Sequence, residues 1–230
     1  LLIVRPEGRL YFLNAQFVAE QLDALVVQHA PRVLTIDLSR VPDIEYSALQ
    51  MLAQLDHRMA ERGVTSLNVR AMENLAAAQA ADIVALTVPF SHQSSTLEAV
   101  RAALEGKILI DVTVPLVPPK VMRVQLPPEG SAGQIAQALL GENVRVVSAF
   151  QNVAANHLQE GKGLDCDVLV CGDNKEARGE VIKLVEAAGL RGFHAGSIAN
   201  AAAVEAMTSL LIFINKQYNC HSGIRVTGLE

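Results

Sequence analysis

The residue types that most often carry chemistry are few and poorly spaced in this sequence. The three cysteines (Cys166, Cys171 and Cys220) form no CxxC pair, which predicts reduced, mostly buried thiols and no disulfide framework. The histidines are scattered without the spacing of metal ligands. No catalytic triad and no convincing carboxylate pair is visible. The sequence therefore predicts no metal site and no catalytic acid–base residue.

Composition limits the class of protein. The 230 residues are 50% hydrophobic but only 4% aromatic, so we expect a folded chain with an aliphatic core. A net charge of −5 argues against a nucleic-acid-binding protein. The most apolar late stretch, 207–214, is far shorter than the ~20 residues of a membrane span. We expect a cytoplasmic protein without membrane insertion, and the start without Met suggests that an N-terminal piece is missing.

Strand-like and helix-like patterns alternate along the chain, which predicts an α/β fold with a largely parallel sheet. Strands are expected at residues 1–4, 9–13, 33–38, 64–69, 83–88, 107–113, 145–148, 167–171 and 191–195. Helices are expected after a cap at Asn14 and at 47–62, 74–81, 94–104, 134–140, 175–188 and 200–218. A proline-rich loop covers 115–128. The last helix is apolar on several sides, so it should be deeply buried or lie in a dimer interface.

The first part of the chain carries three stretches typical of one family: RPEGRLYF at 5–12, VLTIDLS at 33–39 and VPDIEYSAL at 41–49. On these residues, 1–68 resembles a partial STAS domain, the α/β module of sulfate-type anion transporters and of anti-sigma-factor antagonists. The resemblance implies a hydroxyl residue at a helix start, and Ser47 stands there. Ser47 is either a phosphorylation site, where the helix N-terminus would stabilise the added charge, or simply an N-cap.

The rest of the chain carries separated motifs in a recognisable order. They are MENLAA at 72–77, TVPFSH at 87–92, DVTVPLVP at 111–118, SAFQNVAA at 148–155, VCGD at 170–173, HAG at 194–196 and EAMT at 205–208. On these motifs, 69–230 resembles the NADP-dependent reductases of the 8-hydroxy-5-deazaflavin coenzyme (coenzyme F420). The resemblance implies hydride transfer between NADP(H) and the deazaflavin. Both reacting centres are carbon, so ring stacking and water exclusion are the main requirements.

A feature expected for this family is missing. A Rossmann domain holds the dinucleotide pyrophosphate with a GxGxxG turn after its first strand, and this chain has no such motif. Gly161 and Gly163 are followed by Leu164, so they do not form one. The family places the turn before residue 69, where the STAS-like piece stands here. We therefore expect a STAS-like domain (1–68) fused to an N-terminally truncated Rossmann domain (69–230), with impaired reductase activity.

The resemblance also implies a set of cofactor-binding residues. Thr87, Val88, Pro89 and His92 would lie along the nicotinamide ribose and pyrophosphate. The others are Val117 and Pro118 against the deazaflavin, Gln151, Asn152, Val153 and Ala154 against the ring system, and Thr208 closing the pocket from the last helix. The family often has His and Thr where this chain has Gln151 and Asn152. His92 alone could equally be a cap or surface residue, and Asn152 a helix cap.

Two further expectations concern partners. The alternative to an enzyme is a non-catalytic STAS-type regulatory or protein-interaction module, in which the reductase-like part is only a scaffold. The all-round apolar final helix predicts a homodimer, because exposing it in a monomer would leave a large apolar patch.

Overall fold

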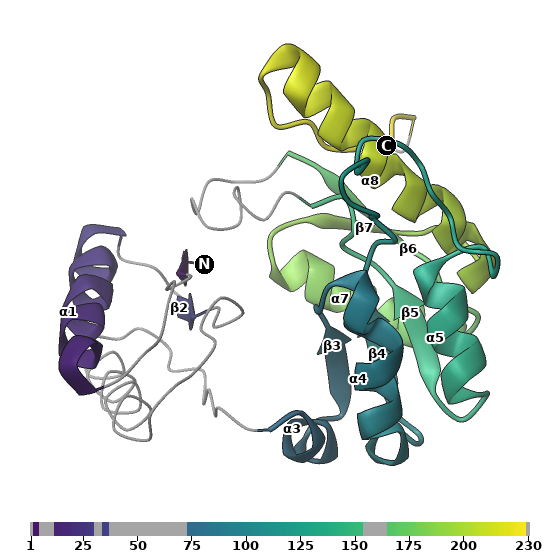
Figure 1. The fold of residues 1–230 in the computed structure, drawn as a ribbon, viewed down its shortest axis with the longest axis horizontal. Coiled ribbons are helices and arrows are strands. Elements are labelled where there is room, and N and C mark those ends of the chain that lie inside the picture. Colours follow the sequence, from purple (N-terminus) through teal and green to yellow (C-terminus); the bar gives the residue numbers. More distant parts are fainter. Residues whose placement is uncertain (1, 5–11, 30–33, 37–72, 154–164, 229–230) are drawn as a thin grey trace. The chain divides into compact units, whose positions relative to one another are not determined.

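The computed structural model describes residues 2–4, 12–29, 34–36, 73–153 and 165–228 of the chain (Figure 1). Two compact units are present. The first comprises Leu1–Ala71 and Ala155–Gly163, and the second comprises Met72–Ala154 and Leu164–Glu230.

The described part of the first unit is a small parallel α/β element. Strand β1 (Leu2–Val4) pairs with strand β2 (Leu34–Ile36), and helix α1 (Phe12–His29) connects them. Leu22 and Val26, four positions apart on one helix face, are buried.

Two details of the predicted first unit are wrong. Phe12 and Leu13, expected at the end of a strand, belong to α1. Asn14 therefore lies inside the helix and cannot cap it. Ser47, the expected helix 47–62 and the expected strand 64–69 lie outside the described residues.

The second unit is built on parallel strands. Its strands are β3 (Ile83–Leu86), β4 (Ile108–Asp111), β5 (Arg145–Ser148), β6 (Asp167–Val170) and β7 (Arg191–His194). Strands β3, β4 and β5 form a parallel sheet in that order, and β6 and β7 form a parallel pair. An antiparallel bridge between Ser148 and Cys171 joins β5 to the segment that leaves β6. The prediction of a largely parallel α/β fold is confirmed.

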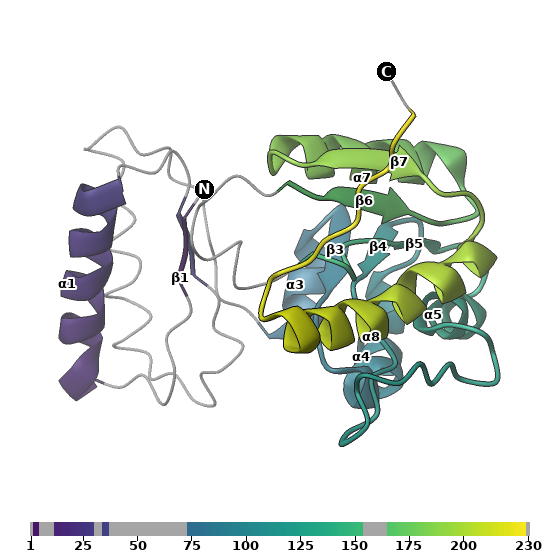
Figure 2. The same ribbon diagram turned by 90° about the horizontal axis from the view of Figure 1, so that it is seen from above.

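Helices cover both faces of this sheet. They are α3 (Asn74–Ala80), α4 (Gln93–Val100), α5 (Ala132–Leu140), α7 (Lys175–Ala187) and α8 (Ala201–Tyr218), with short 3-10 turns η1 (Phe90–His92), η2 (Arg101–Ala103) and η3 (Ile198–Asn200). Figures 1 and 2 show α7 on one face and α4, α5 and α8 on the other. The proline-rich stretch contains no helix or strand between β4 and α5.

Alternating strand residues supply two cores, because successive side chains of a strand point to opposite faces. Leu109 and Val146 belong to the core beneath α4, α5 and α8. Ile108, Ile110 and Val147 belong to the core beneath α7. Both faces of β4, β5 and β6 are therefore largely buried, which matches their continuous apolar runs in the sequence, whereas β3 and β7 are partly exposed.

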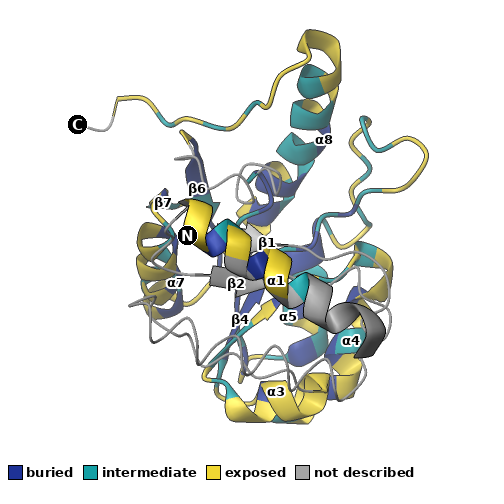
Figure 3. Cartoon of the chain, turned by 90° about the vertical axis from the view of Figure 1, so that its left-hand side faces the viewer, coloured by how far each residue is buried: buried dark blue, intermediate teal, exposed yellow. Residues whose placement is uncertain are grey.

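Helix α8 is buried only along part of its length. Val204, Glu205 and Ser209 are buried, whereas Leu210 and Phe213 are about half exposed (Figure 3). Of the two alternatives expected for this helix, deep burial does not hold for its second half, and the dimer interface stays a prediction. Among the described helices, Ile198–Tyr218 has the length and apolar composition to cross a membrane, and 28% of its apolar 18-residue window is buried. A core helix of a soluble protein can meet the same criteria.

Candidate active site

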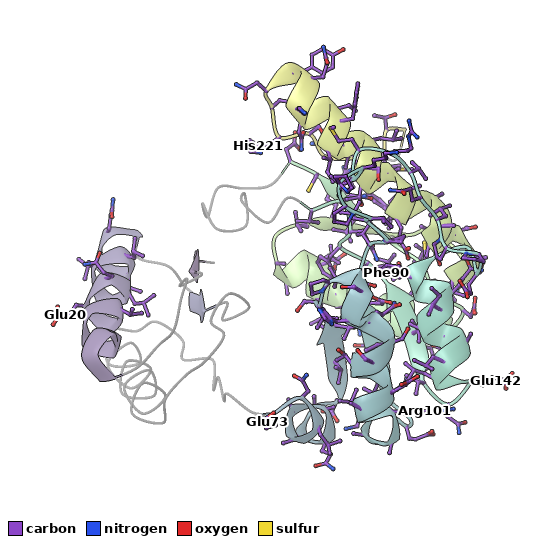
Figure 4. All side chains as sticks on the ribbon, in the orientation of Figure 1. Glu20, Glu73, Phe90, Arg101, Glu142 and His221 are labelled. Atoms are coloured by element: carbon purple, nitrogen blue, oxygen red, sulfur yellow. The ribbon has the colours of Figure 1, made fainter. Side chains whose placement is uncertain are left out.

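Parallel strands bring the segments after β3, β4 and β5 to one edge of the sheet. Figure 4 shows Phe90, which follows β3, well separated from Arg101 and Glu142, which precede β4 and β5. Ligands of open α/β sheets bind outside the carboxyl ends of the strands. The edge that carries Phe90 is therefore the candidate active site.

A buried polar network ties the start of α4, the helix that follows β3, to the end of β4 at this edge. The side-chain amide of Gln93, at the start of α4, donates to Asp111 Oδ2 (2.5 Å), Thr113 Oγ1 (3.1 Å) and the Ala132 carbonyl (2.8 Å). Asp111 Oδ1 accepts from the Thr113 backbone N–H (2.9 Å) and from its hydroxyl (2.6 Å). Burial raises the pKa of the Asp111 carboxyl, and the hydrogen bonds from Thr113 and Gln93 oppose that rise. This network fixes where the chain leaves β4.

The turn after β5 is held by its own buried side chains. Phe150 adopts a left-handed backbone conformation (φ 72°), which is rare for an aromatic residue and requires support from its surroundings. The Gln151 amide donates to the Asp111 carbonyl (2.9 Å) and to Ser148 Oγ (2.7 Å). Its Oε1 is buried and has no hydrogen-bond partner. Gln151 therefore connects the ends of β4 and β5 and keeps one acceptor unused.

Asn152 and Thr208 join this turn to α8. The Asn152 amide donates to the Val204 carbonyl (3.0 Å) and to Thr208 Oγ1 (3.0 Å). The Thr208 hydroxyl donates to the Gln151 carbonyl (3.1 Å). Two of the residues predicted for the site, Gln151 and Asn152, are thus each hydrogen-bonded to a third, Thr208.

Glu205, one helical turn before Thr208, is a buried carboxylate at the N-terminus of α5. Its Oε2 accepts from the Ala132 N–H (2.7 Å) and its Oε1 from the Gly133 N–H (3.0 Å). A side chain on Gly133 would meet Ile198 Cδ1 at 3.0 Å and Ser148 Cβ at 3.2 Å, so the close approach of α5 depends on glycine there. Burial raises the pKa of Glu205 to about 7 against the opposing effect of the two N–H groups.

The turn after β3 is more open. Thr87, Pro89 and His92 are exposed and Val88 is half-buried. Thr87 and Val88 line a mostly apolar groove of about 310 Å³ between β3, α3 and α4. The backbone of the turn is closed by the His92 N–H, which donates to the Pro89 carbonyl (2.8 Å). These side chains are accessible to a ligand.

The other predicted site residues are less closely connected to this edge. Val117 and Pro118 are exposed in the proline-rich loop, whose Arg123 carbonyl accepts from Ser209 Oγ of α8 (3.5 Å). Val153 is half-buried beside Asn152, and Ala154 lies outside the described residues. Among the described residues, no group of His, Cys, Asp or Glu could hold a metal ion.

Sequence reasoning missed the residues that organise this edge: Gln93, Asp111, Thr113, Ser148 and Glu205. Two of them carried a usable signal. Asp111 is a lone acid at the end of an apolar strand, and Glu205 is a lone acid in an apolar helix. Buried acids need hydrogen-bond donors, which places them at strand ends or helix N-termini.

A second cavity, of about 640 Å³, lies along α5. Gln137, Glu142, Arg145 and Asp173 are among its lining residues, and no residue predicted for the site contributes to it. The larger cavity is therefore separate from the candidate active site.

The fold and the site together define a Rossmann-type α/β protein with its polar edge at the carboxyl ends of the strands. A solved structure from Arthrobacter sp. FB24, suggested to be an F420-dependent NADP reductase, superimposes with a TM-score of 0.66 at 20% identity, covering 98% of each chain. A hypothetical protein from Sinorhizobium meliloti superimposes with a TM-score of 0.54 at 21% identity, covering 88% of each chain.

Sequence relatives are more specific. The F420-dependent NADP reductase of Methanocaldococcus jannaschii is 37% identical over 178 residues, which cover 75% of this chain and 79% of the relative. That of Methanothermobacter marburgensis is 35% identical over 198 residues, covering 83% and 86%. The chain belongs to the F420-dependent NADP reductase family. The STAS domain family also matches residues 1–83, which extends past the first unit into α3 and the first residue of β3.

Proposed function

We propose that this chain is an oxidoreductase that transfers a hydride between NADP(H) and the 8-hydroxy-5-deazaflavin coenzyme. The observation that carries the proposal is the 35–37% identity to F420-dependent NADP reductases over most of the chain. In the reaction one ring is oxidised as the other is reduced, and the coenzymes themselves supply the redox chemistry. The part of the protein is to hold the two rings against each other and to exclude water.

The residues at the carboxyl edge of the sheet are suited to hold the nicotinamide and deazaflavin rings. Thr87, Val88, Pro89 and His92 are proposed to lie along the nicotinamide ribose and pyrophosphate, and the accessible groove at Thr87 and Val88 supports this role. Asn152 and Thr208 are already oriented by each other, so the turn at 151–153 would meet the rings as a preformed surface. Val117 and Pro118 are exposed apolar groups suited to packing on the deazaflavin.

The chain is less well suited to bind the pyrophosphate of NADP(H), because its sequence has no GxGxxG turn. A hydrogen bond to a charged group contributes about 1.5–3 kcal/mol, so losing three would weaken binding by about 4.5–9 kcal/mol, or roughly three to six orders of magnitude. We propose that the isolated chain is a poor reductase for this reason.

Titration of the purified chain with NADPH, followed by heat or fluorescence, tests both statements. No saturation up to millimolar NADPH is expected if the phosphate contacts are missing. Micromolar saturation would overturn the proposed impairment, and turnover with the deazaflavin should then be measured. If the chain bound neither NADPH nor the deazaflavin, the reductase assignment would be contradicted.

The STAS match at residues 1–83 favours one alternative, a non-catalytic regulatory or protein-interaction module. Substitution of Ser47 by Ala would abolish phosphate incorporation by a partner kinase if that residue is the modified site. A chain that reduces the deazaflavin at ordinary enzyme rates would exclude a purely scaffolding role for the reductase-like part.

The oligomeric state and the compartment are also proposals. Leu210, Phe213 and Tyr218 expose large apolar or aromatic surfaces on α8, which supports a homodimer formed through this helix. Sedimentation of the wild type and of Phe213→Glu would show a dimer converted to a monomer. A cytoplasmic location accords with its reduced cysteines, of which Cys166 and Cys171 are buried.

A further inference from the structure

Gln93 occupies a core position of helix α4. Together with Leu97 and Val100 it forms the buried stripe of this helix, at spacings of four and three residues. Leu97 and Val100 belong to the apolar core, whereas Gln93 is a polar residue that is only 1% exposed. Glutamine is mostly found at the surface, and an apolar side chain would fill this position equally well. The hydrogen bonds of the amide must therefore explain the glutamine.

The orientation of the Gln93 amide is fixed by its surroundings. Its nitrogen lies 2.5 Å from Asp111 Oδ2, 2.8 Å from the Ala132 carbonyl and 3.1 Å from Thr113 Oγ1. All three are acceptors, because the Thr113 hydroxyl donates its own proton to Asp111 Oδ1 (2.6 Å). Turning the amide over would place Oε1 against these three acceptors. Gln93 therefore keeps its Oε1 unpaired and acts here as a donor only.

The turn after β3 is fastened at both of its ends to the end of β4. At its start, the Val112 N–H donates to the Leu86 carbonyl (3.1 Å). At its other end, the backbone N–H of Gln93 donates to the carbonyl of Phe90, the residue that marks this turn in Figure 4. The side chain of Gln93 then reaches Asp111. A single residue thus closes the turn with its backbone and joins it to the sheet with its amide.

We propose that Gln93 is a positioning residue for the candidate active site: its side-chain amide anchors the turn at residues 87–92 to the end of β4 and to the start of α5. Thr87 and Val88 of this turn line the groove together with Leu97 of α4, so the anchor also sets the shape of the groove. The inference rests on the proposed function only in treating the turn as a coenzyme contact. The anchoring itself is independent of any ligand.

Two substitutions separate the hydrogen bonds of Gln93 from its packing. Gln93→Leu fills a similar volume but leaves Asp111 Oδ2 and the Ala132 carbonyl without this donor. Gln93→Glu keeps the length of the side chain, and as a carboxylic acid it can still donate to Asp111. The new carboxyl should keep its proton at pH 6, because two buried carboxylates in contact do not both ionise. The described hydrogen bonds connect the amide to one further ionisable group, Glu205, through the Ala132 N–H.

Amide hydrogen exchange of the ligand-free chain at pH 6, with each rate divided by its intrinsic value, tests the inference. The amides at positions 92 and 93 close the turn, and in Gln93→Leu we expect them to lose about tenfold in protection, the equivalent of one hydrogen bond. The amides of Arg145 and Ala195, which are bonded elsewhere in the unit, report overall stability. They should lose clearly less than the turn does. Gln79→Leu, at an exposed glutamine of α3, is the matched control and should behave like the wild type.

Gln93→Glu supplies the rescue. Its turn amides should stay within about threefold of the wild type at pH 6, because one of the hydrogen bonds of the amide is restored. Protection that falls as far as in Gln93→Leu would overturn the inference. So would wild-type protection of the turn in Gln93→Leu, or an equal loss at the turn and at Arg145 and Ala195.

Asp111→Asn keeps the test valid if Gln93→Leu does not fold. The oxygen of the new amide is needed by the Thr113 N–H and hydroxyl, so its nitrogen meets the Gln93 nitrogen, donor against donor. A selective loss of protection at the turn in this variant supports the inference. Unchanged protection would overturn it.

Titration with NADPH to millimolar concentration, followed by the NMR shifts of the turn amides, separates this inference from the proposed function. The shifts should be smaller in Gln93→Leu than in the wild type. If NADPH moves no turn amide in the wild type but exchange behaves as expected, the proposed coenzyme contact fails and the positioning role stands. If NADPH shifts and exchange are the same in both proteins, the positioning role fails and the proposed function stands.

Discussion

The turns that follow β3 and β5 lie at the same edge of one sheet but are built in different ways. After β3, Thr87, Pro89 and His92 face solvent, and backbone contacts close the turn. After β5, Gln151 and Asn152 are more than 90% buried, and their amides carry the hydrogen bonds. The turns at the carboxyl ends of two parallel strands thus carry polar residues with two different roles. Those after β3 are accessible to a ligand, and those after β5 shape the backbone.

This difference bears on how candidate sites are recognised. A polar residue at the carboxyl end of a parallel strand is commonly taken as a ligand contact. Here the buried members of that set satisfy each other, with only Gln93 Oε1 and Gln151 Oε1 left without partners among the buried side-chain atoms of the described residues. Measurements that separate stability from binding should therefore respond differently to substitutions in the two turns.

The largest effect is expected from Asp111→Ala, because the Asp111 carboxylate is fully buried and accepts hydrogen bonds from Gln93 and Thr113. The change removes the acceptor of the Thr113 N–H and one of the acceptors of the Gln93 amide. We expect the free energy of unfolding to fall by about 3 kcal/mol or more, measured by urea denaturation. Asp82→Ala, at an exposed position before β3, is the control and should change it by less than about 0.5 kcal/mol. A loss below about 1 kcal/mol in Asp111→Ala would show that this network does not support the edge.

The next effect is a pH dependence that comes from Glu205. Its pKa is about 7 in the folded protein and 4.5 ordinarily, so between these values the folded state holds a proton that the unfolded state has released. The stabilisation is present below about pH 4.5 and is lost as the pH rises through about 7. At 1.36 kcal/mol per pH unit it amounts to about 3 kcal/mol.

The measurement is the free energy of unfolding of the wild type minus that of Glu205→Gln, taken at pH 5 and at pH 8. This difference should be larger, in favour of the wild type, at pH 5 than at pH 8. The subtraction removes the contributions of groups that titrate alike in both proteins. An equal difference at the two pH values would mean that Glu205 does not take up its proton in this range.

Sequence patterns could place the strands of this edge but not the side chains that organise it. The apolar runs at 83–88 and 107–113 predict β3 and β4, and β4 is buried on both faces, as such a run indicates, whereas β3 is only partly buried. Gln93 carries no such signal, since its three acceptors come from 111, 113 and 132 and meet only when the sheet is assembled. Glu205 likewise accepts a hydrogen bond from Gly133, which is 72 positions away in the sequence. Long-range polar contacts leave no periodic mark in the sequence.

A smaller effect is expected where α8 meets the turn after β5. Asn152→Ala removes two hydrogen bonds and Thr208→Val removes its hydroxyl from the same cluster. We expect losses of about 1–2 kcal/mol for the first and about 1 kcal/mol for the second. Because the two side chains share a hydrogen bond, the double variant should lose less than the sum, by about 0.5–1 kcal/mol. Additive losses in urea denaturation would indicate that the two residues act independently.

The smallest effect on stability is expected for His92→Ala, which sharpens the contrast between the two turns. The His92 side chain is exposed, and only its backbone N–H closes the turn, a contact that alanine retains. The free energy of unfolding should change by less than about 0.5 kcal/mol. If His92 contacts NADP(H), the dissociation constant should nevertheless rise several-fold, whereas Ser94→Ala, at an exposed position of α4, should leave it unchanged. If His92→Ala is destabilised but binds NADP(H) as the wild type does, His92 has a structural role, like the buried residues of the turn after β5.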